Sequence, residues 1–424
     1  MFAKRLFLVL LIAALALLPS AGAQEGKPEA KGLRPDAPPY AVHGPYWVGT
    51  REIMIEDAER PLQGTLWYPA LNPAGMDEAA TYSAGLAAIA PSLDAVQGHA
   101  LRDAAPNISS GPYPLVVFSH GLGTPRVVCA YLLEHLASWG FVAVAIDHPG
   151  STLADSERAN TKSWRAAYDY RSFTSLVTRP IDIRRAIDYA GTLTAADGAF
   201  AGMIAMDRIA VVGYSLGGYT ALVSAGGRLH FNLPNAEANP EACFSTPMLC
   251  ELFAEETAPQ RESQLIDLAG VEVHPGDLWP SLGDPRVDAI LPLAPALSLA
   301  FGTDGLEQVE VPALVLGASG DRMVGTLYGA GWVYDHLGSA QKGLVVFENG
   351  NHFLFGECGS PAWTAIAFDQ CSDPVWDMLR AHDLTNHFAT AFLLATLKGD
   401  EDAAAALAPD QVQFPGIRYE VQGF

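Results

Sequence analysis

The chain has 424 residues, of which 50% are hydrophobic and 17% are charged, and this balance supplies a large core and excludes a disordered chain. A formal net charge of −22 at pH 7 argues against nucleic acid or another polyanion as a partner. Because a chain of this length can form one domain with insertions, we predict a single domain over residues 40–424.

The first 23 residues have the three parts of a secretory signal peptide. Lys4 and Arg5 precede an apolar run at residues 6–18, and residues 21–23 form a small-residue cleavage site, Ala-Gly-Ala. The apolar run is shorter than the roughly 20 residues of a membrane span, so we expect cleavage after Ala23 rather than a retained anchor. The sequence therefore predicts a periplasmic or secreted protein without an integral membrane span after processing.

The folded domain is expected to begin after a flexible tether. Residues 24–39 contain Pro, Lys and Glu with no hydrophobic period, which predicts this tether. Residues 51–69 have two apolar segments around a turn at residues 58–61, which predicts a β-hairpin. Residues 71–111 are Ala-rich with scattered Gly and Pro, and we expect one short helix within a long loop there.

From residue 114 onward, strand-like and helix-like segments alternate along the chain. Strands are predicted at residues 114–119, 141–146, 208–213, 287–293, 311–316 and 344–347, and helices at residues 127–138, 179–193, 216–225 and 376–397. Continuously apolar strands that alternate with helices are typical of a mostly parallel sheet with helices on both faces. The predicted fold class is therefore α/β.

The segment around Ser215 is the most informative motif. A predicted strand ends at Gly213, and the sequence Gly213-Tyr-Ser-Leu-Gly217 leads directly into a helix of small and apolar residues. A serine on a sharp strand-to-helix turn, with glycines two before and two after it, is the pattern of the nucleophile elbow. It predicts an α/β-hydrolase fold with Ser215 as the nucleophile. The alternative is a glycine turn with a purely structural role.

Residues 228–286 interrupt the alternation of strands and helices after the nucleophile helix. The segment is too long for an ordinary connection, and long loops of this kind are often functional. We predict a lid over Ser215, with a surface excursion as the alternative. Because export favours disulfides, Cys243 and Cys250 are expected to form a local staple inside this segment.

Export also bears on the three other cysteines. Cys358 and Cys371 lie in one turn-rich segment and are expected to form a second local disulfide. Cys129 is left over in an apolar run and is predicted to be a buried thiol. The sequence holds no C-x-x-C motif and no closely spaced Cys/His set, so no metal is expected. A hydrolase with a serine nucleophile implies no organic cofactor either.

A serine nucleophile needs an imidazole to take its proton and a carboxylate to orient that imidazole. In α/β-hydrolases the acid follows the serine in the chain, and the histidine follows the acid. Asp321 comes after the strand predicted at residues 311–316, and His352 lies in the turn after the strand predicted at residues 344–347. The rival acid is Asp288, which is expected at the opposite edge of the sheet because it precedes the rest of its strand.

The turn at residues 118–123 is rich in glycine and follows the strand predicted at residues 114–119. Such a turn can direct the amide of Leu122 at the site facing the serine, and the amide of Leu216 supplies a second donor for an oxyanion hole. His120 lies in the same turn but precedes the serine in the chain. We therefore expect it to hold the loop by hydrogen bonds rather than to act as the base.

The segments Tyr113-Pro-Leu-Val-Val-Phe-Ser-His-Gly-Leu-Gly123 and Leu136-Ala-Ser-Trp-Gly-Phe141, with the elbow motif, resemble the secreted platelet-activating factor acetylhydrolases and their bacterial, dienelactone-hydrolase-like relatives. The resemblance extends in order from about residue 40 to residue 397. It implies a calcium-independent carboxylic ester hydrolase that acts on short or oxidised acyl chains in phospholipid-like or other small esters.

The resemblance supports the roles of Ser215, His352, Leu122 and Leu216, but two features depart from it. The animal acetylhydrolases place their acid near the end of the strand that follows the nucleophile helix. The corresponding Leu-Pro-Leu-Ala-Pro stretch at residues 291–295 has no acid. A dienelactone hydrolase proper uses a cysteine nucleophile, where this chain has serine.

The sequence thus predicts an exported serine ester hydrolase with Ser215, Asp321 and His352 as catalytic residues, and a small-molecule or lipid ester as its substrate. One alternative is a cutinase-like polyester depolymerase, which would need an open cleft. The other is a catalytically silent hydrolase-like binding protein. The sequence predicts no particular oligomeric state.

Overall fold

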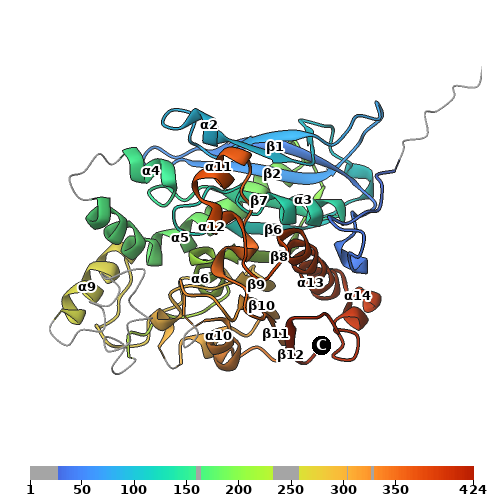
Figure 1. The fold of residues 1–424 in the computed structure, drawn as a ribbon. Coiled ribbons are helices and arrows are strands. Elements are labelled where there is room, and N and C mark those ends of the chain that lie inside the picture. Colours follow the sequence, from blue (N-terminus) through green and yellow to red (C-terminus); the bar gives the residue numbers. More distant parts are fainter. Residues whose placement is uncertain (1–26, 159–163, 233–256, 303, 326–328) are drawn as a thin grey trace, which may run out of the picture.

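The computed structural model describes residues 27–158, 164–232, 257–302, 304–325 and 329–424, and a ten-stranded sheet runs through its centre (Figure 1). The strands of this sheet are β1 Trp47–Ile55, β2 Leu62–Ala70, β5 Leu101–Arg102, β6 Tyr113–Ser119, β7 Val142–Ile146, β8 Ile204–Tyr214, β9 Ala289–Leu293, β10 Ala313–Ala318, β11 Lys342–Phe347 and β12 Ile417–Gln422. A separate two-stranded sheet consists of β3 Ala80–Ser83 and β4 Ala95–Gly98.

Helices lie on both sides of the large sheet (Figure 1). The α-helices are α2 Pro91–Asp94, α3 Ala130–Ser138, α4 Leu153–Arg158, α5 Trp164–Thr194, α6 Leu216–Ser224, α9 Ala258–Ala269, α10 Ala330–His336, α11 Pro361–Ile366, α12 Phe368–Cys371, α13 Met378–Lys398 and α14 Glu401–Ala406. Short 3-10 helices are η1 Pro39–Ala41, η2 Ile108–Ser110, η4 Ser298–Phe301, η5 Leu306–Gln308 and η6 His352–Phe355.

The strand order is β12-β11-β10-β9-β8-β6-β7-β2-β1-β5. The strands from β11 to β7 run parallel to one another, whereas β12 and β2 join them antiparallel at either side. Strands β6, β7 and β9 are buried at every position, which explains why their sequences are continuous apolar runs. The predicted fold class, a mostly parallel sheet with helices on both faces, is confirmed.

The hydrophobic core has two layers, one on each face of the sheet. Along β6, Val116 and Phe118 belong to the layer that includes α3 and α13, and Leu115 and Val117 belong to the layer that includes α5 and α6. This alternation is the two-residue period of a strand. Because the strands from β11 to β7 run in the same direction, their carboxyl ends meet at one edge of the sheet.

The predicted hairpin at residues 51–69 is present as the antiparallel pair β1 and β2. Residues 71–111 contain the expected short helix, α2, but also β3, β4 and β5, which were not predicted. The reason is long-range burial: the hydroxyl of Tyr82 accepts from Trp67 Nε1 at 2.8 Å and donates to Glu134 Oε1 at 2.5 Å. Such contacts outweigh the weak strand propensity of an Ala-rich segment.

Helix α5 begins well before the helix predicted at residues 179–193. It continues through Pro180, although proline has no N–H to offer the carbonyl four residues earlier. That carbonyl belongs to Leu176, and it accepts the hydroxyl of Tyr219 from α6 at 2.8 Å instead. A side chain of the nucleophile helix thus supplies the hydrogen bond that the proline cannot make.

At the amino-terminal end of the chain, residues 1–23, the predicted signal peptide, lie outside the described residues, and the signal peptide stays a prediction. Within the predicted tether, the backbone N–H groups of Leu33 and Arg34 each donate to the carboxylate of Asp383 on α13 at 2.9 Å. At the other end, β12 was not predicted; it is an edge strand in which half-buried and exposed residues alternate.

Among the described residues, no helix combines the length and the hydrophobicity that a membrane crossing requires. Cys358 and Cys371 form the expected disulfide, with their Cα atoms 5.3 Å apart. Cys129 is a buried free thiol, as predicted. The expected pair of Cys243 and Cys250 lies outside the described residues.

The predicted lid, residues 228–286, is described only in part because residues 233–256 lie outside the described residues. In the remainder, α9 packs against α5 (Figure 1). Trp279 is fully buried, and its Nε1 donates to Glu262 Oε1 at 2.8 Å. The role of this segment as a lid stays a prediction.

Candidate active site

The turn between β8 and α6 holds Ser215 in an unusual backbone conformation, with φ 58° and ψ −115°. A non-glycine residue rarely adopts a positive φ, and such strain is concentrated at functional sites. The glycines around it are required by space. A Cβ on Gly213 would lie 1.9 Å from the carbonyl oxygen of Gly217, and a Cβ on Gly217 would lie 1.8 Å from the carbonyl oxygen of Ser119.

The structure brings Ser215, His352 and Asp321 together in one hydrogen-bonded chain. His352 Nε2 lies 2.9 Å from Ser215 Oγ, and His352 Nδ1 lies 2.6 Å from Asp321 Oδ2. A carboxylate on Nδ1 selects the tautomer that carries its proton there, which leaves the Nε2 lone pair to accept from the serine hydroxyl. His352 is 5% exposed and Asp321 is 4% exposed, so water competes little for these hydrogen bonds.

The parallel sheet explains why residues so distant in sequence meet. Strands β8, β10 and β11 end at the same edge, and Ser215, Asp321 and His352 each follow one of them. The other oxygen of Asp321, Oδ1, accepts from the backbone N–H of Met323 at 2.8 Å, which holds the carboxylate in place. The rival acid, Asp288, precedes β9 and accepts from the N–H of Ile209 at 2.8 Å, away from this edge.

The two predicted oxyanion donors lie on segments that adjoin Ser215. Leu216 is the first residue of α6, and Leu122 lies in the turn after β6. A Cβ placed on Gly121, the neighbour of Leu122, would lie 3.3 Å from Ser215 Cβ, so this turn passes directly beside the serine. No hydrogen bond within the described part of the chain occupies the N–H of Leu122 or of Leu216. The two N–H groups can therefore donate to a ligand oxygen.

His120 holds the turn, as its position before the serine predicted. Its Nδ1 lies 2.6 Å from the carbonyl oxygen of Gly121, and its Nε2 accepts from the backbone N–H of His148 at 3.0 Å. Burial, with the positive charge of Arg179 nearby, lowers the pKa of His120 well below its usual value. The imidazole is thus a neutral part of the loop.

A second serine, histidine and aspartate set was missed by the sequence analysis. Ser119 Oγ lies 2.9 Å from His148 Nε2, and His148 Nδ1 lies 2.9 Å from Asp182 Oδ2. All three residues are fully buried, so no substrate can reach this serine. Burial also lowers the pKa of His148 to about 4. The signal that could have indicated this set is the position of His148 directly after the strand predicted at residues 141–146.

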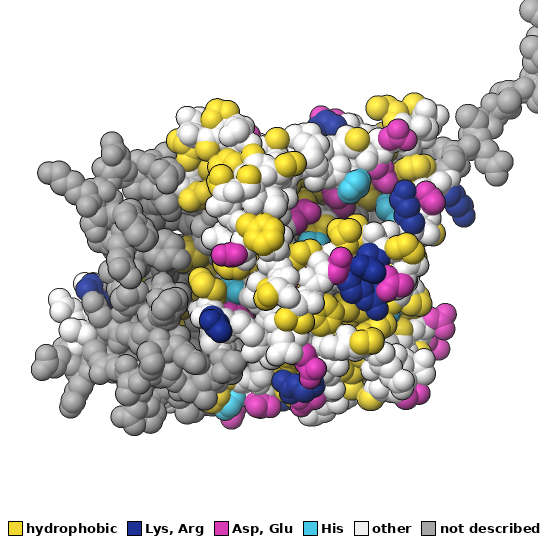
Figure 2. Space-filling view, in the orientation of Figure 1, with side chains coloured by type: hydrophobic (Ala, Val, Ile, Leu, Met, Phe, Trp, Pro, Cys, Tyr) yellow, Lys and Arg dark blue, Asp and Glu magenta, His cyan; other side chains and the backbone are white. Residues whose placement is uncertain are grey.

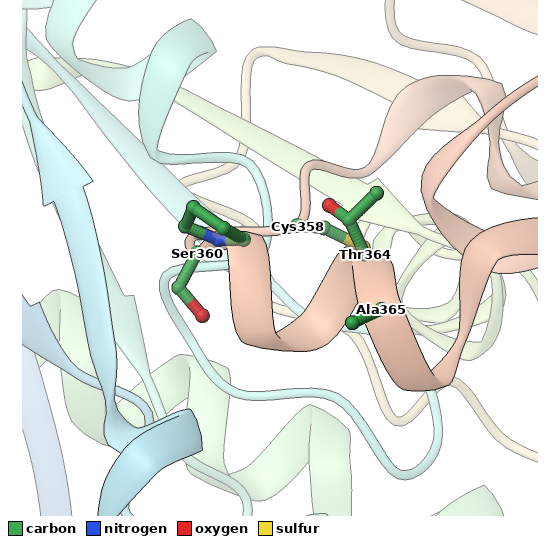
Figure 3. Close-up of a pocket in the computed structure, with 6 residues that line it drawn as sticks. Cys358, Ser360, Thr364 and Ala365 are labelled. Carbon is green, nitrogen blue, oxygen red and sulfur yellow. The ribbon is translucent and has the colours of Figure 1, made fainter.

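A surface pocket of about 590 Å³ lies on the segment that follows His352 (Figure 3). It is lined by Cys358, Gly359, Ser360, Pro361, Thr364 and Ala365. Its walls come from the disulfide-bonded loop and α11, and none of the three residues of the hydrogen-bonded chain lines it. The pocket is therefore a feature of this loop and not the space above Ser215.

Two family models match the chain. A model described as platelet-activating factor acetylhydrolase, isoform II, matches residues 36–163, and a model described as alpha/beta hydrolase family matches residues 116–367, more than half of the chain. No curated protein matches it. The solved structures that match include a ferulic acid esterase from Streptomyces cinnamoneus, with a TM-score of 0.56 and 19% identity. That match covers 92% of this chain and 99% of the esterase chain, and at this identity it shows a shared fold alone.

Proposed function

This chain belongs to the alpha/beta hydrolase family, and we propose that within this family it is an exported serine esterase that works through an acyl-enzyme. The matched families make it a carboxylic ester hydrolase. The observation that carries the proposed mechanism is the hydrogen-bonded chain from Asp321 through His352 to Ser215. A serine hydroxyl becomes an effective nucleophile only when a positioned imidazole takes its proton.

The first half of the reaction forms the acyl-enzyme. Ser215 Oγ attacks the ester carbonyl carbon while His352 Nε2 accepts the hydroxyl proton, and Asp321 stabilises the imidazolium that results. The carbonyl oxygen becomes an oxyanion, which the N–H groups of Leu122 and Leu216 stabilise. When the carbon–oxygen bond of the ester breaks, the imidazolium gives its proton to the leaving alcohol.

The second half of the reaction releases the acid. Water takes the place of the alcohol, and His352 Nε2 accepts its proton as the water oxygen attacks the acyl carbon. Collapse of the second tetrahedral intermediate returns the proton to Ser215 Oγ. The same two N–H groups stabilise both intermediates. The enzyme regains its starting state with one ester bond cleaved and one water consumed.

We further propose small or short-chain esters as the substrates, including phospholipid-like acetyl esters. The support is the acetylhydrolase family match over residues 36–163, a range that contains β6 and the turn with Leu122. Export is supported by the signal-peptide pattern at residues 1–23 and by the Cys358–Cys371 disulfide, a bond typical of oxidising compartments.

A panel of p-nitrophenyl esters of increasing acyl length tests this proposal. We expect the purified enzyme to hydrolyse the acetyl and butyryl esters faster than the long-chain esters. Ser215→Ala should reduce turnover by a factor of roughly 10⁴ to 10⁶ without loss of the fold. Full activity of Ser215→Ala would contradict the mechanism. Equal rates on all chain lengths, or a preference for long chains, would contradict the substrate class.

A further inference from the structure

The carbonyl oxygen of Gly121, which directly precedes the N–H of Leu122, is surrounded by hydrogen-bond donors. It lies 2.6 Å from His120 Nδ1, and it accepts from Thr124 Oγ1 at 3.1 Å and from Thr124 N at 3.4 Å. Arg179 Nη2 lies 3.5 Å away. A carbonyl oxygen has two lone pairs, so these donors fully occupy it and fix the direction in which it points.

Arg179 also holds the neighbouring peptide. Its Nη1 donates to the carbonyl oxygen of His120 at 2.5 Å, and its Nη2 donates to Ser151 Oγ at 2.6 Å. The side chain is fully buried, so water does not replace these hydrogen bonds. The planar guanidinium reaches two successive carbonyl groups of the turn at once, a geometry that the compact ammonium of lysine does not reproduce.

The imidazole of His120 is itself held by a hydrogen bond from the backbone of His148. Its Nε2 accepts from the backbone N–H of His148, so its Nδ1 carries the proton that it donates to the carbonyl oxygen of Gly121. His148 is held in turn by its hydrogen bonds to Ser119 and Asp182. The buried serine, histidine and aspartate set therefore supports the donors on this one carbonyl group.

We propose that Arg179, Thr124 and His120 are positioning residues for the proposed oxyanion hole. They fix the orientation of the Gly121–Leu122 peptide, which is trans. In a trans peptide the carbonyl and the N–H point in opposite directions. With the carbonyl held by these donors, the N–H points away from them. A Cβ on Gly121 would lie 3.3 Å from Ser215 Cβ, so the turn adjoins the serine, and the proposed oxyanion hole requires this N–H to face it. A flipped peptide would instead direct a carbonyl oxygen at the developing oxyanion.

This inference rests on the proposed function, because the orientation of the N–H matters only if Ser215 attacks an ester. The first test uses Thr124, which is half-buried and can be changed without opening the core. Thr124→Val keeps the shape and removes the hydroxyl, and Thr124→Ser keeps the hydroxyl. We expect Thr124→Val to lower kcat and kcat/KM by the same factor, about 3- to 10-fold for one hydrogen bond, and Thr124→Ser to stay within about twofold of wild type.

The second test compares two fully buried arginines, Arg179 and Arg126. Arg179→Lys keeps the charge but loses the forked hydrogen bonds to the turn, and we expect kcat to fall by at least about 10-fold with KM unchanged. Arg126→Lys is the matched control, because the Arg126 guanidinium bonds Thr65, Asp147 and Glu52 and none of the groups that hold the Gly121 carbonyl. We expect Arg126→Lys to keep kcat within about twofold, with folding of all variants checked by circular dichroism.

The outcomes separate this inference from the function on which it rests. Retained hydrolysis by Ser215→Ala overturns the proposed function and the positioning role with it. If Ser215→Ala is inactive but Thr124→Val and Arg179→Lys keep the wild-type kcat, or only raise KM, the positioning role alone is overturned. A loss of kcat in Arg126→Lys as large as that in Arg179→Lys overturns it as well, because the effect would then follow from the loss of any buried guanidinium.

Discussion

At the scale of single residues, Gly217 of the elbow shows how little space the turn leaves. Gly217 and Gly331 both lie in helices, α6 and α10, where alanine is intrinsically favoured over glycine by about 1 kcal/mol. Their surroundings are opposite. A Cβ on Gly217 would lie 1.8 Å from a carbonyl oxygen, whereas a Cβ on Gly331 would have no described heavy atom within 4 Å apart from its chain neighbours and the backbone of its own helix.

We therefore expect the same substitution to have opposite effects at these two positions. Gly217→Ala should lower the melting temperature and abolish ester hydrolysis, because the turn must open to admit the methyl group. Gly331→Ala should raise the melting temperature slightly and leave activity unchanged. Thermal unfolding followed by circular dichroism measures both. An active, stable Gly217→Ala enzyme would contradict the close approach of the two backbones.

The acid at position 321 can be tested against its rival at position 288. Asp321→Asn should reduce kcat by roughly 10⁴, because an amide favours the wrong tautomer of His352 while the geometry persists. Asp288→Asn should be mild, because an asparagine oxygen can still accept from the N–H of Ile209. Steady-state kinetics of both variants on one activated ester decide the question. A severe Asp288→Asn and a mild Asp321→Asn would reverse the assignment.

At the scale of elements, helices α5 and α6 are joined at the proline of α5. Tyr219→Phe removes the hydroxyl that donates a hydrogen bond to the Leu176 carbonyl. We expect the free energy of unfolding to fall by about 1–3 kcal/mol. In the Pro180→Ala background the new N–H can bond that carbonyl, so the same change should cost less. A double-mutant cycle by urea unfolding measures this coupling. Additive effects of the two substitutions would contradict it.

Elements were predicted well where the evidence lay in the local sequence. Strands β6, β7 and β9 are continuous apolar runs in the sequence, so they could be predicted directly. The candidate catalytic residues Ser215, Asp321 and His352 could be predicted from their order in the chain and their positions after strands. Strands β3, β4 and β12 could not be predicted, because they depend on contacts with distant residues. The start of α5 was missed because a tyrosine from α6 compensates for Pro180. The buried set of Ser119, His148 and Asp182 was missed because its members meet only in the folded core, and their spacing in the sequence gives no motif.

At the scale of the whole molecule, acidic side chains are scattered over the visible face (Figure 2), while some carboxyl groups are buried. Glu134 is 6% exposed and accepts from the hydroxyl of Tyr82 and from the N–H of His99. Burial raises the pKa of Glu134 to about 8. In the unfolded chain this pKa falls to that of an ordinary glutamate, about 4.3. Between about pH 4.3 and about pH 8, the folded state therefore binds a proton that the unfolded state has lost.

The stabilisation from protonated Glu134 is fully present below the unfolded pKa and is lost as the pH rises through about 8. Between pH 5 and pH 8 we expect the stability of wild type to fall relative to that of Glu134→Gln, with a slope on the order of 1 kcal/mol per pH unit at most. Urea unfolding of both proteins across this range measures the difference. Parallel stability curves would show that the carboxyl group stays ionised in the fold.

The central claim is that Ser215 carries the acyl group during turnover. The most direct test quenches the enzyme in acid early in its reaction with p-nitrophenyl acetate and locates the acetyl group by mass spectrometry of its peptides. We predict one acetyl group per chain, on Ser215, and none on the buried Ser119 or in Ser215→Ala. An acetyl group on another residue, or continued turnover by Ser215→Ala without an adduct at position 215, would contradict the account.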